Sequence, residues 1–398
     1  MSRRTQPGVP TLLRALNDRA ALELLVSHGP LTRAQLSELT GLSRVTAHHS
    51  IERLESRGLV HQVGVQAGGR GPNAQVYAVV PAAAYVVGVE VGPRKVVAAG
   101  ADITGVLGAR IELDADGNDD PVAMVHNAVV KVARRARVPL DRVRRVVLGT
   151  PGVVDPATGD IAFSWDLPRW HRGLVNELRA DLRRPVVIEN DVNLAAIAEF
   201  RTGAAQGVDD FVLLWVARGL GLGVVLGGRL HRGATGGAGE IGYLPVPGGP
   251  LAHEVSRRVK GSFQRLAGAD SVQALARSHG YRATGAADAV RAAVQAGPAG
   301  EPLLTELARR LALGVAAVCV VLDPALVVLT GDICQAGGAG LASRVASEVA
   351  AIAPVSPRVV PTMVPADPVL HGALITAVDA AREEVFASTA DSPEAAAD

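Results

Sequence analysis

The sequence predicts an α/β protein in which an N-terminal winged helix-turn-helix precedes a larger body made of two successive α/β units. Three observations lead to this prediction. Short amphipathic helical segments separated by a glycine turn occupy the start of the chain, and two alternating segments typical of a β-hairpin follow them. The rest of the chain alternates buried strand segments with helical ones. At 398 residues and 48% hydrophobic content, two or three domains are expected.

The composition excludes several protein classes. Aromatic residues make up only 3% of the chain, whereas 44 Gly and 24 Pro suit an α/β protein with many tight turns. The longest strongly apolar run, Leu311–Leu322, is too short to cross a bilayer, and the first residues lack the apolar stretch of a secretory signal. We therefore expect a cytoplasmic protein with no membrane partner. Two cysteines, Cys319 and Cys334, are too few for a disulfide framework or a cysteine-based metal site.

The first 80 residues predict the winged helix-turn-helix. Apolar residues over 12–26 form one face of a first helix. Thr32 and Gln35 make a capping box that starts a second helix, and Gly41 ends it. Ser43 caps a third helix. The residues expected to face inward on this third helix are Val45, Ala47, Ile51 and Leu54.

Strand-like segments at 59–65 and 75–79 predict a hairpin whose wing, residues 68–72, carries Arg70. The first 80 residues hold nine Arg against five acidic residues, so the positive charge is concentrated at one end of a chain of net charge +1. We expect this segment to bind double-stranded operator DNA, although a helical protein-interaction module with a solvated face is the alternative. The predicted DNA-binding residues are Ser43, Arg44, Thr46, His48, His49 and Arg70.

The body begins near residue 84 and reads as two similar units. Strands of the first unit are predicted at 85–91, 96–102, 106–113, 145–148 and 185–189. Its helices are predicted at 121–137, 173–182 and 192–201. Strands of the second unit are predicted at 211–216, 223–226, 325–330 and 358–364, before a closing helix at 370–385. The small, acidic segment 388–398 is expected to be a disordered tail.

Three motifs in the body carry a family resemblance. They are Gly149-Thr150-Pro151-Gly152-Val153-Val154-Asp155, Glu189-Asn190-Asp191-Val192-Asn193-Leu194-Ala195-Ala196, and a glycine-rich run from Gly219 through Gly227-Gly228 to Gly239-Glu240-Ile241-Gly242. Together they resemble the ROK family of repressors, uncharacterised open reading frames and sugar kinases. The resemblance spans nearly the whole chain, including the winged helix of the repressor branch (residues 1–80).

The resemblance implies a two-lobed body with the actin and hexokinase type of fold. A first lobe at 84–200, completed by the C-terminal helix 370–386, would face a second lobe at 201–369. A sugar or sugar derivative is expected to bind between these lobes.

In family kinases the aspartate of the Glu-Asn-Asp motif, here Asp191, accepts the proton of the attacking sugar hydroxyl. Asn190 and Glu240 would hold neighbouring hydroxyls. A structural alternative is that Asp191 only caps a helix that begins at Val192. The ligand-binding residues implied by the resemblance are Asn190, Asp191, Glu240, Tyr243 and Glu254.

Both phosphate-binding loops of the family kinases are altered in this chain. The usual Asp-x-Gly-Gly-Thr-Lys turn reads Glu90-Val91-Gly92-Pro93-Arg94-Lys95, where Pro93 lacks an amide donor and Arg94 replaces the hydroxyl residue. The usual Gly-Thr-Gly loop reads Gly219-Leu220-Gly221, and Leu220 cannot donate a hydrogen bond. Because phosphoryl transfer depends on positioning and electrostatics, we expect no kinase activity and a vestigial base at Asp191.

The residues of the family's zinc site are also replaced. Tyr243 stands in place of a histidine, and the proline- and glycine-rich stretch 245–250 occupies the position of the cysteines, so no metal or cofactor is expected. His253 alone is more typical of an ordinary helix residue than of a ligand. Glu254 is the counterpart of a sugar-binding glutamate that follows the last cysteine in the family.

The sequence thus predicts a DNA-binding transcriptional regulator, a repressor, that responds to a sugar or sugar derivative. Paired recognition helices favour a homodimer or homotetramer on a two-fold operator. The alternative is a sugar kinase with an appended DNA-binding domain, which retention of Asn190, Asp191 and Glu240 favours. A third possibility is a regulator whose body has lost the sugar and serves only for dimerisation.

Overall fold

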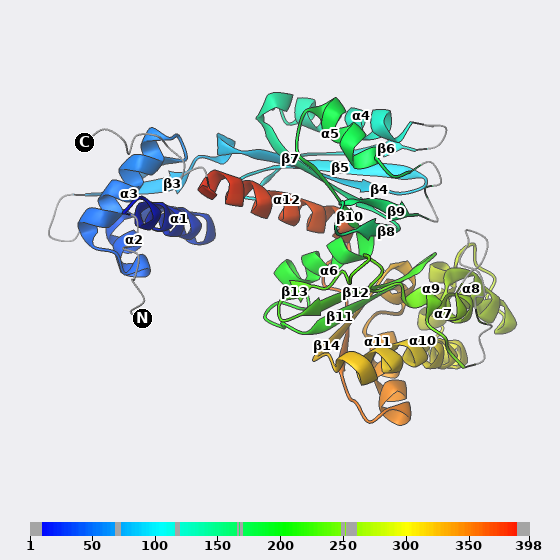
Figure 1. Cartoon of the computed structure of the whole chain (residues 1–398). Helices are drawn as coiled ribbons and strands as arrows, with labels where there is room; N and C mark the ends of the chain where they lie inside the picture. Colours follow the sequence, from blue (N-terminus) through cyan, green and yellow to red (C-terminus); the bar gives the residue numbers. More distant parts are fainter. Residues whose placement is uncertain are drawn as a thin grey trace, which may run out of the picture.

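The computed structural model confirms the α/β class, with a winged helix-turn-helix domain followed by a body that contains two five-stranded mixed sheets (Figure 1). The structure describes residues 10–67, 73–115, 120–164, 167, 170–247, 251 and 261–387. Three predicted features lie outside these residues: the wing tip with Arg70, the segment with His253 and Glu254, and the tail 388–398. Among the helices that the structure describes, none is both long enough and apolar enough to cross a membrane.

The winged helix domain forms as its capping signals predict. Its elements are α1 (Pro10–His28), β1 (Leu31–Thr32), α2 (Arg33–Thr40), α3 (Arg44–Ser56), β2 (Val60–Gln66) and β3 (Ala74–Val79). The Thr32 hydroxyl accepts a hydrogen bond from the Gln35 amide at 3.2 Å, and the Gln35 side chain accepts one from the Thr32 amide at 2.8 Å. Gly41 ends α2 at a φ of 72°, a conformation that glycine adopts without strain. Ser43 caps α3.

One expected core residue of α3 is wrong. Ala47, Ile51 and Leu54 are buried, but the Val45 side chain is 65% exposed. With about 100° of rotation per residue, Val45 lies roughly 200° from Ala47 and so falls on the opposite face. Val45 therefore belongs to the exposed face of α3, beside Arg44.

A buried ion pair holds α3 against α1. Asp18 is only 3% exposed, and its two carboxylate oxygens accept hydrogen bonds from the Arg53 guanidinium at 2.9 and 2.6 Å. Arg53 also donates to Ser50 at 3.2 Å. The hydrogen bonds satisfy a charge that burial alone would disfavour.

The first body sheet has the strand order β10-β7-β4-β5-β6. Its strands are β4 (Tyr85–Val91), β5 (Lys95–Asp102), β6 (Leu107–Asp114), β7 (Val143–Thr150) and β10 (Val186–Asn190). Both faces are apolar because each carries a helical layer. Val87 and Val89 pack in the cluster of α4 (Pro121–Arg135), and α5 (Leu174–Leu182) joins the same layer. The alternating residue Val86 packs with α12 (Pro368–Ala387) on the other face.

The second body sheet repeats this plan in the order β13-β12-β11-β14-β15. Its strands are β11 (Phe211–Val216), β12 (Leu220–Leu226), β13 (Arg229–Leu230), β14 (Leu326–Thr330) and β15 (Arg358–Pro361). One face packs against a helical layer, to which α7 (Ser262–Ala267), α8 (Ala269–Ser278), α9 (Ala286–Gln295), α10 (Glu301–Leu322) and α11 (Asp332–Ile352) contribute. The last strand ends at Pro361, earlier than the predicted 364, because the chain turns there toward α12.

Helix α6 (Asp191–Thr202) lies between the two sheets and packs on α12 and on β12 (Figure 1). Glycines permit the close approach to β12: a Cβ on Gly221 would lie 2.7 Å from the Val192 side chain, and one on Gly223 would lie 2.6 Å from Ala196. A small antiparallel hairpin of β8 (Val153–Asp155) and β9 (Asp160–Phe163) follows the first sheet.

The Asp18–Arg53 pair predicts the stability of the winged helix domain. Arg53→Ala leaves Asp18 buried without its partner and should destabilise the domain by about 2 kcal/mol, less than for a fully buried pair because the Arg53 side chain is 36% exposed. Chemical denaturation followed by circular dichroism measures this loss. The exposed Arg14 on α1 supplies the control Arg14→Ala. Equal stability of the two variants would contradict the prediction.

Candidate nucleic-acid interface and interlobe site

The first turns of α3 bring together five of the predicted DNA-binding residues, Ser43, Arg44, Thr46, His48 and His49. The Ser43 hydroxyl accepts a hydrogen bond from the Thr46 amide at 3.1 Å and lies 2.8 Å from the Thr46 hydroxyl. Ser43 is therefore first a helix cap. Arg44 is exposed and makes no hydrogen bond or ion pair with another residue that the structure describes. Its guanidinium is available to bases or phosphates.

Glu52 contacts both histidines and was missed by sequence reasoning. His48 Nε2 lies 3.2 Å from one carboxylate oxygen of Glu52, and His49 Nδ1 lies 3.1 Å from the other. The hydrogen bond with His49 holds the pKa of Glu52 below its ordinary value. Spacings of three and four residues along a helix are the signal that predicts such contacts. Glu52 orients the two imidazole rings and offsets part of the positive charge of this face.

The Glu-Asn-Asp motif lies where β10 ends and α6 begins. The helix starts at Asp191, not Val192, and its cap is Asn190. The Asn190 side chain accepts from the Asn193 amide at 3.0 Å and donates to the Gly152 carbonyl at 3.0 Å. The interpretation of Asp191 as the cap of a helix that begins at Val192 is therefore wrong, because the Asn190 side chain, one residue earlier, accepts from the Asn193 amide and caps the helix. Asp191 stands in the first turn, where its carboxylate accepts from the Val192 amide at 2.8 Å.

An ion pair between a buried carboxylate and an exposed arginine joins this motif to the second sheet. Glu189 is 6% exposed, and one carboxylate oxygen accepts from the Asn190 amide at 3.0 Å and the Asn193 side chain at 2.9 Å. The other oxygen accepts from Arg232, with Nε and Nη2 both at 2.7 Å. Arg232 follows β13, so the pair crosses between the two halves of the body. Neither residue was predicted as a site residue, since nothing in the local sequence links them.

Asp191 interacts electrostatically with acidic residues from several elements, and we call Glu90, Asp191, Glu240, Tyr243 and Asp367 the interlobe site. Burial raises the pKa of Glu240, and the charge of Asp191 raises it further. Burial, then Asp191 and Asp367, raise the pKa of Glu90 to about 7. Burial and Glu240 raise the pKa of Tyr243 to about 12. Glu90 is the last but one residue of β4 and was not predicted as a ligand-binding residue.

Neither segment that corresponds to a kinase phosphate loop forms an open loop here. Pro93 and Arg94 are exposed in a tight turn between β4 and β5, closed by a hydrogen bond from the Gly92 amide to the Lys95 carbonyl at 2.9 Å. Leu220 lies in β12 with its side chain 9% exposed in the core. Its amide donates to the Gln264 side chain at 2.8 Å, so this amide already has a partner.

The residues present do not fit the zinc site of the family. The Tyr243 phenol, with its pKa raised to about 12, keeps its proton near neutral pH and is a poor substitute for a histidine ligand. The cysteines of the chain are Cys319 and Cys334, both buried, on α10 and α11.

Comparison with known proteins places these observations in a family. The ROK family matches residues 86–381, and a winged helix-turn-helix DNA-binding family matches residues 14–61. This chain belongs to the ROK family. A xylose repressor from Bacillus subtilis is 27% identical over 246 residues, which cover 59% of this chain and 62% of the repressor. The matched region is thus less than two thirds of that relative.

Two solved structures show how far the fold is shared. A ROK family transcriptional regulator, a homologue of the Escherichia coli MLC protein, superposes with a TM-score of 0.76 at 21% identity, covering 95% of this chain and 99% of the regulator. A ROK hexokinase from Thermus thermophilus superposes with a TM-score of 0.62 at 29% identity, covering 75% of this chain and 99% of the hexokinase. The body of this ROK protein therefore has a fold found in both regulators and kinases.

Glu90 predicts a pH dependence of stability. Its pKa is about 7 in the folded protein, against an ordinary value of 4.5. As pH rises from about 4.5 through 7, the unfolded chain releases the Glu90 proton before the folded protein does. The free energy of unfolding therefore falls over this range. Glu90→Gln should remove that loss and be the more stable protein at pH 8, by at most about 3 kcal/mol at ~1.4 kcal/mol per pKa unit.

Urea denaturation of wild type and Glu90→Gln at pH 5 and pH 8 measures this difference. The exposed Glu38 on α2 supplies the control Glu38→Gln, which also removes one acidic side chain. Parallel pH profiles for wild type and Glu90→Gln would contradict the assigned pKa.

Proposed function

We propose that this ROK protein is a DNA-binding transcriptional regulator, a repressor, which acts in the cytoplasm and responds to a sugar or sugar derivative bound between the lobes. The observation that carries the proposal is the combination, in one chain, of an exposed arginine at the start of a recognition helix with a carboxylate-rich interlobe site. The name of the xylose repressor supports it.

The operator would be read by α3 and the wing. Arg44 would contact base edges or phosphates, with His48 and His49 on the same helix, and Arg70 of the wing would supply a further contact. Two copies of the chain, as a homodimer or within a homotetramer, would place two recognition helices on successive half-sites.

The effector would bind at the interlobe site. Asp191 and Glu240 offer oxygens that accept hydrogen bonds from sugar hydroxyls, and Asn190, Tyr243 and Glu254 would complete the binding set. Asp367 pairs with Arg110, but the charge of Asp191 raises the pKa of Glu90 and of Glu240, so further negative charge is unfavourable beside these carboxylates. They therefore favour an uncharged sugar over a sugar phosphate. No metal or cofactor is part of this proposal.

The second candidate is a sugar kinase with an appended DNA-binding domain. Asp191 favours it, because the carboxylate stands in the first turn of α6 at the position of the family base. Against it stand Leu220, whose side chain lies in the core and whose amide is already bonded, and Pro93, which lacks an amide donor. A working kinase must bind Mg-ATP, whereas a sensor need not.

Electrophoretic mobility shift with the protein's own promoter region tests the proposal, with and without a panel of sugars, sugar phosphates and Mg-ATP. Specific DNA binding that one sugar alters would support the regulator. Binding that no compound alters would favour a regulator whose body only dimerises. Failure to bind, together with binding of Mg-ATP and phosphorylation of a sugar, would favour the kinase.

We expect operator affinity to depend on the Arg44 side chain. Arg44→Ala removes a guanidinium that has no partner among the described residues, and operator affinity should fall about 5- to 150-fold, the range for ~1–3 kcal/mol. Arg309→Ala, which removes the same charge from α10 in the second lobe, should leave affinity unchanged. Equal affinity of wild type and Arg44→Ala in fluorescence anisotropy would reject the assignment.

We expect stabilisation by the effector to depend on the Asp191 carboxylate. A ligand at ~100 times its dissociation constant stabilises a protein by about 2.7 kcal/mol, and Asp191→Asn should lose most of this stabilisation while still binding the operator. Thermal denaturation with each sugar of the panel measures the effect. The exposed Asp141→Asn is the matched control. An unchanged ligand-induced shift in Asp191→Asn would remove Asp191 from the site.

A further inference from the structure

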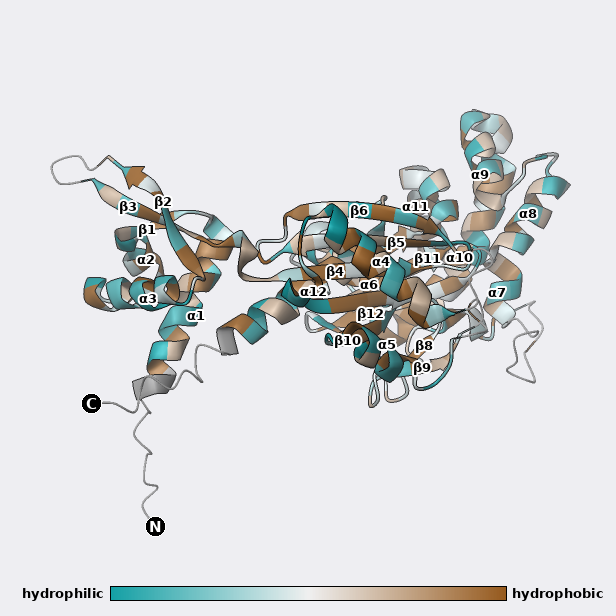
Figure 2. Cartoon of the chain, turned by 90° about the horizontal axis from the view of Figure 1, so that it is seen from above, coloured by the Kyte–Doolittle hydropathy of each residue, from teal (hydrophilic) through white to brown (hydrophobic). Residues whose placement is uncertain are grey.

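The winged helix domain is packed against the body. One hydrophobic cluster contains Leu22 and Leu25 of α1 together with Val378 and Val385 of α12. The connection between β3 and β4 is short and holds a 3-10 turn at Pro81–Ala83. Figure 2 shows the domain to one side of the body, with the end of α12 and this connection between them. A movement of α12 would therefore reach the domain directly.

Three carboxylates near the end of α12 each pair with an arginine from a different element. The pairs are Asp379–Arg201 to the last turn of α6, Glu383–Arg19 to α1, and Glu384–Arg145 to β7. Two of these pairs join α12 to the body, and the third joins it to the winged helix domain.

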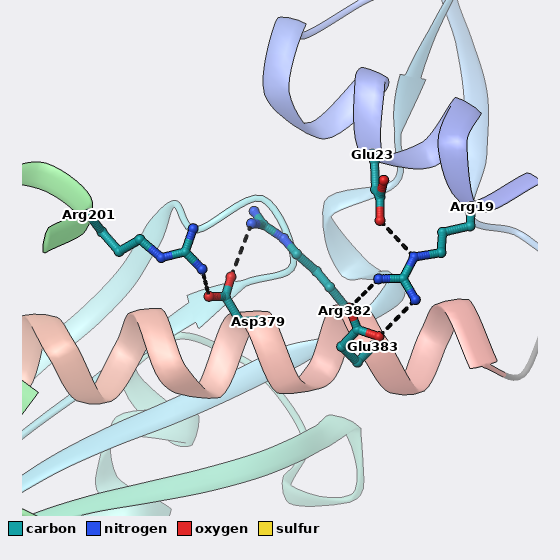
Figure 3. Close-up of polar contacts among 6 residues, drawn as sticks. All are labelled: Arg19, Glu23, Arg201, Asp379, Arg382 and Glu383. Carbon is teal, nitrogen blue, oxygen red and sulfur yellow. Dashed lines mark hydrogen bonds and ion pairs between the residues drawn. The ribbon is translucent and has the colours of Figure 1, made fainter. Parts of the chain in front are cut away.

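The Arg19–Glu383 contact is bidentate and exposed. The Arg19 Nη1 and Nη2 atoms lie 3.0 and 2.5 Å from the two carboxylate oxygens of Glu383, and Nε donates to Glu23 at 2.7 Å (Figure 3). The side chains are 40% and 58% exposed. Exposed ion pairs add little stability, but a two-point contact defines an orientation. This contact can therefore select one position of the domain and still be broken at low cost.

The neighbouring contact belongs to the body alone. Asp379 lies one helical turn before Glu383 and pairs with Arg201 and, at 3.8 Å, with Arg382 (Figure 3). Arg382 also donates to the Ile103 carbonyl at 2.9 Å. Arg201 ends the helix that Asp191 begins, and α6 packs on β12 of the second sheet. A change in the relative position of the two sheets therefore acts on Asp379 through α6.

We propose that α12 transmits the relative position of the two lobes to the winged helix domain, through Arg201–Asp379 on the body side and Glu383–Arg19 on the domain side. A ligand that favours one lobe arrangement would then shift the population of domain orientations. This use in regulation rests on the proposed function, whereas the coupling itself is measurable without DNA or ligand.

Double electron–electron resonance on the full-length chain tests the coupling. Spin labels at the exposed positions Glu38→Cys on α2 and Lys131→Cys on α4 report the distance between domain and body. Cys319 and Cys334 are buried, and their high thiol pKa values disfavour labelling. Circular dichroism verifies that each variant is folded.

The variants distinguish coupling along α12 from a local effect of the Arg19–Glu383 pair. Glu383→Gln should broaden or shift the distance distribution, and Asp379→Asn should do the same although Asp379 does not pair with α1. Glu384→Gln, which breaks only the contact with β7, is the matched control and should leave the distribution unchanged. The charge swap Arg19→Glu with Glu383→Arg should restore the wild-type distribution. No change in Glu383→Gln, or a change there without one in Asp379→Asn, would overturn the proposal.

Operator affinity supplies a second readout. If the DNA-binding orientation falls to about a tenth of the population in Glu383→Gln and Asp379→Asn, apparent affinity falls about tenfold, with no fall in Glu384→Gln. Weaker operator binding by Glu383→Gln and Asp379→Asn than by Glu384→Gln supports the coupling. Equal operator affinities of the three variants, despite altered distances, would overturn the role of the coupling in DNA binding. If the wild-type protein binds no DNA, the proposed function fails while the distance measurement still decides the coupling.

Discussion

Helix α6 packs against α12 on one side and against β12 on the other, where a side chain on Gly221 or Gly223 would collide with it. A buried carboxylate secures this position. Glu199 accepts hydrogen bonds from the amides of Ala204, Met363 and Val364 at 2.6, 3.1 and 3.0 Å, and also pairs with a hydroxyl in the segment that leads into α12. The two sheets, the start of α6 and the path of α12 all depend on this packing.

The same helix gives the interlobe site its electrostatic character. Asp191 begins α6, and its charge raises the pKa of both Glu90 and Glu240. Carboxylates held close together keep their protons more tightly, so they offer both hydrogen-bond donors and hydrogen-bond acceptors. Glu189 stands two residues before Asp191 and pairs with Arg232, which links the two halves of the body. In the proposed function, residues that would bind the effector and a contact between the two halves of the body therefore meet at the start of α6.

The ion pairs made by two consecutive residues of α1, Asp18 and Arg19, differ in burial. Asp18–Arg53 fastens the inside of the winged helix domain with a buried carboxylate, whereas Arg19–Glu383 joins the domain to the body with two exposed side chains. Buried pairs are costly to break, and exposed pairs exchange readily with water. A rigid domain on an adjustable contact is the arrangement that the proposed function requires.

Local signals in the sequence determined the elements of this protein. The Thr32–Gln35 capping box, the left-handed Gly41 and the alternation along β4 each involve residues that are neighbours in the chain, so their patterns could be read directly. The family motif likewise located Asp191. Tertiary structure alone decided the partners. Glu189 meets Arg232 across 43 positions of sequence, and Arg19 meets Glu383 across 364. Folding creates such contacts by packing distant elements, and no local period encodes them.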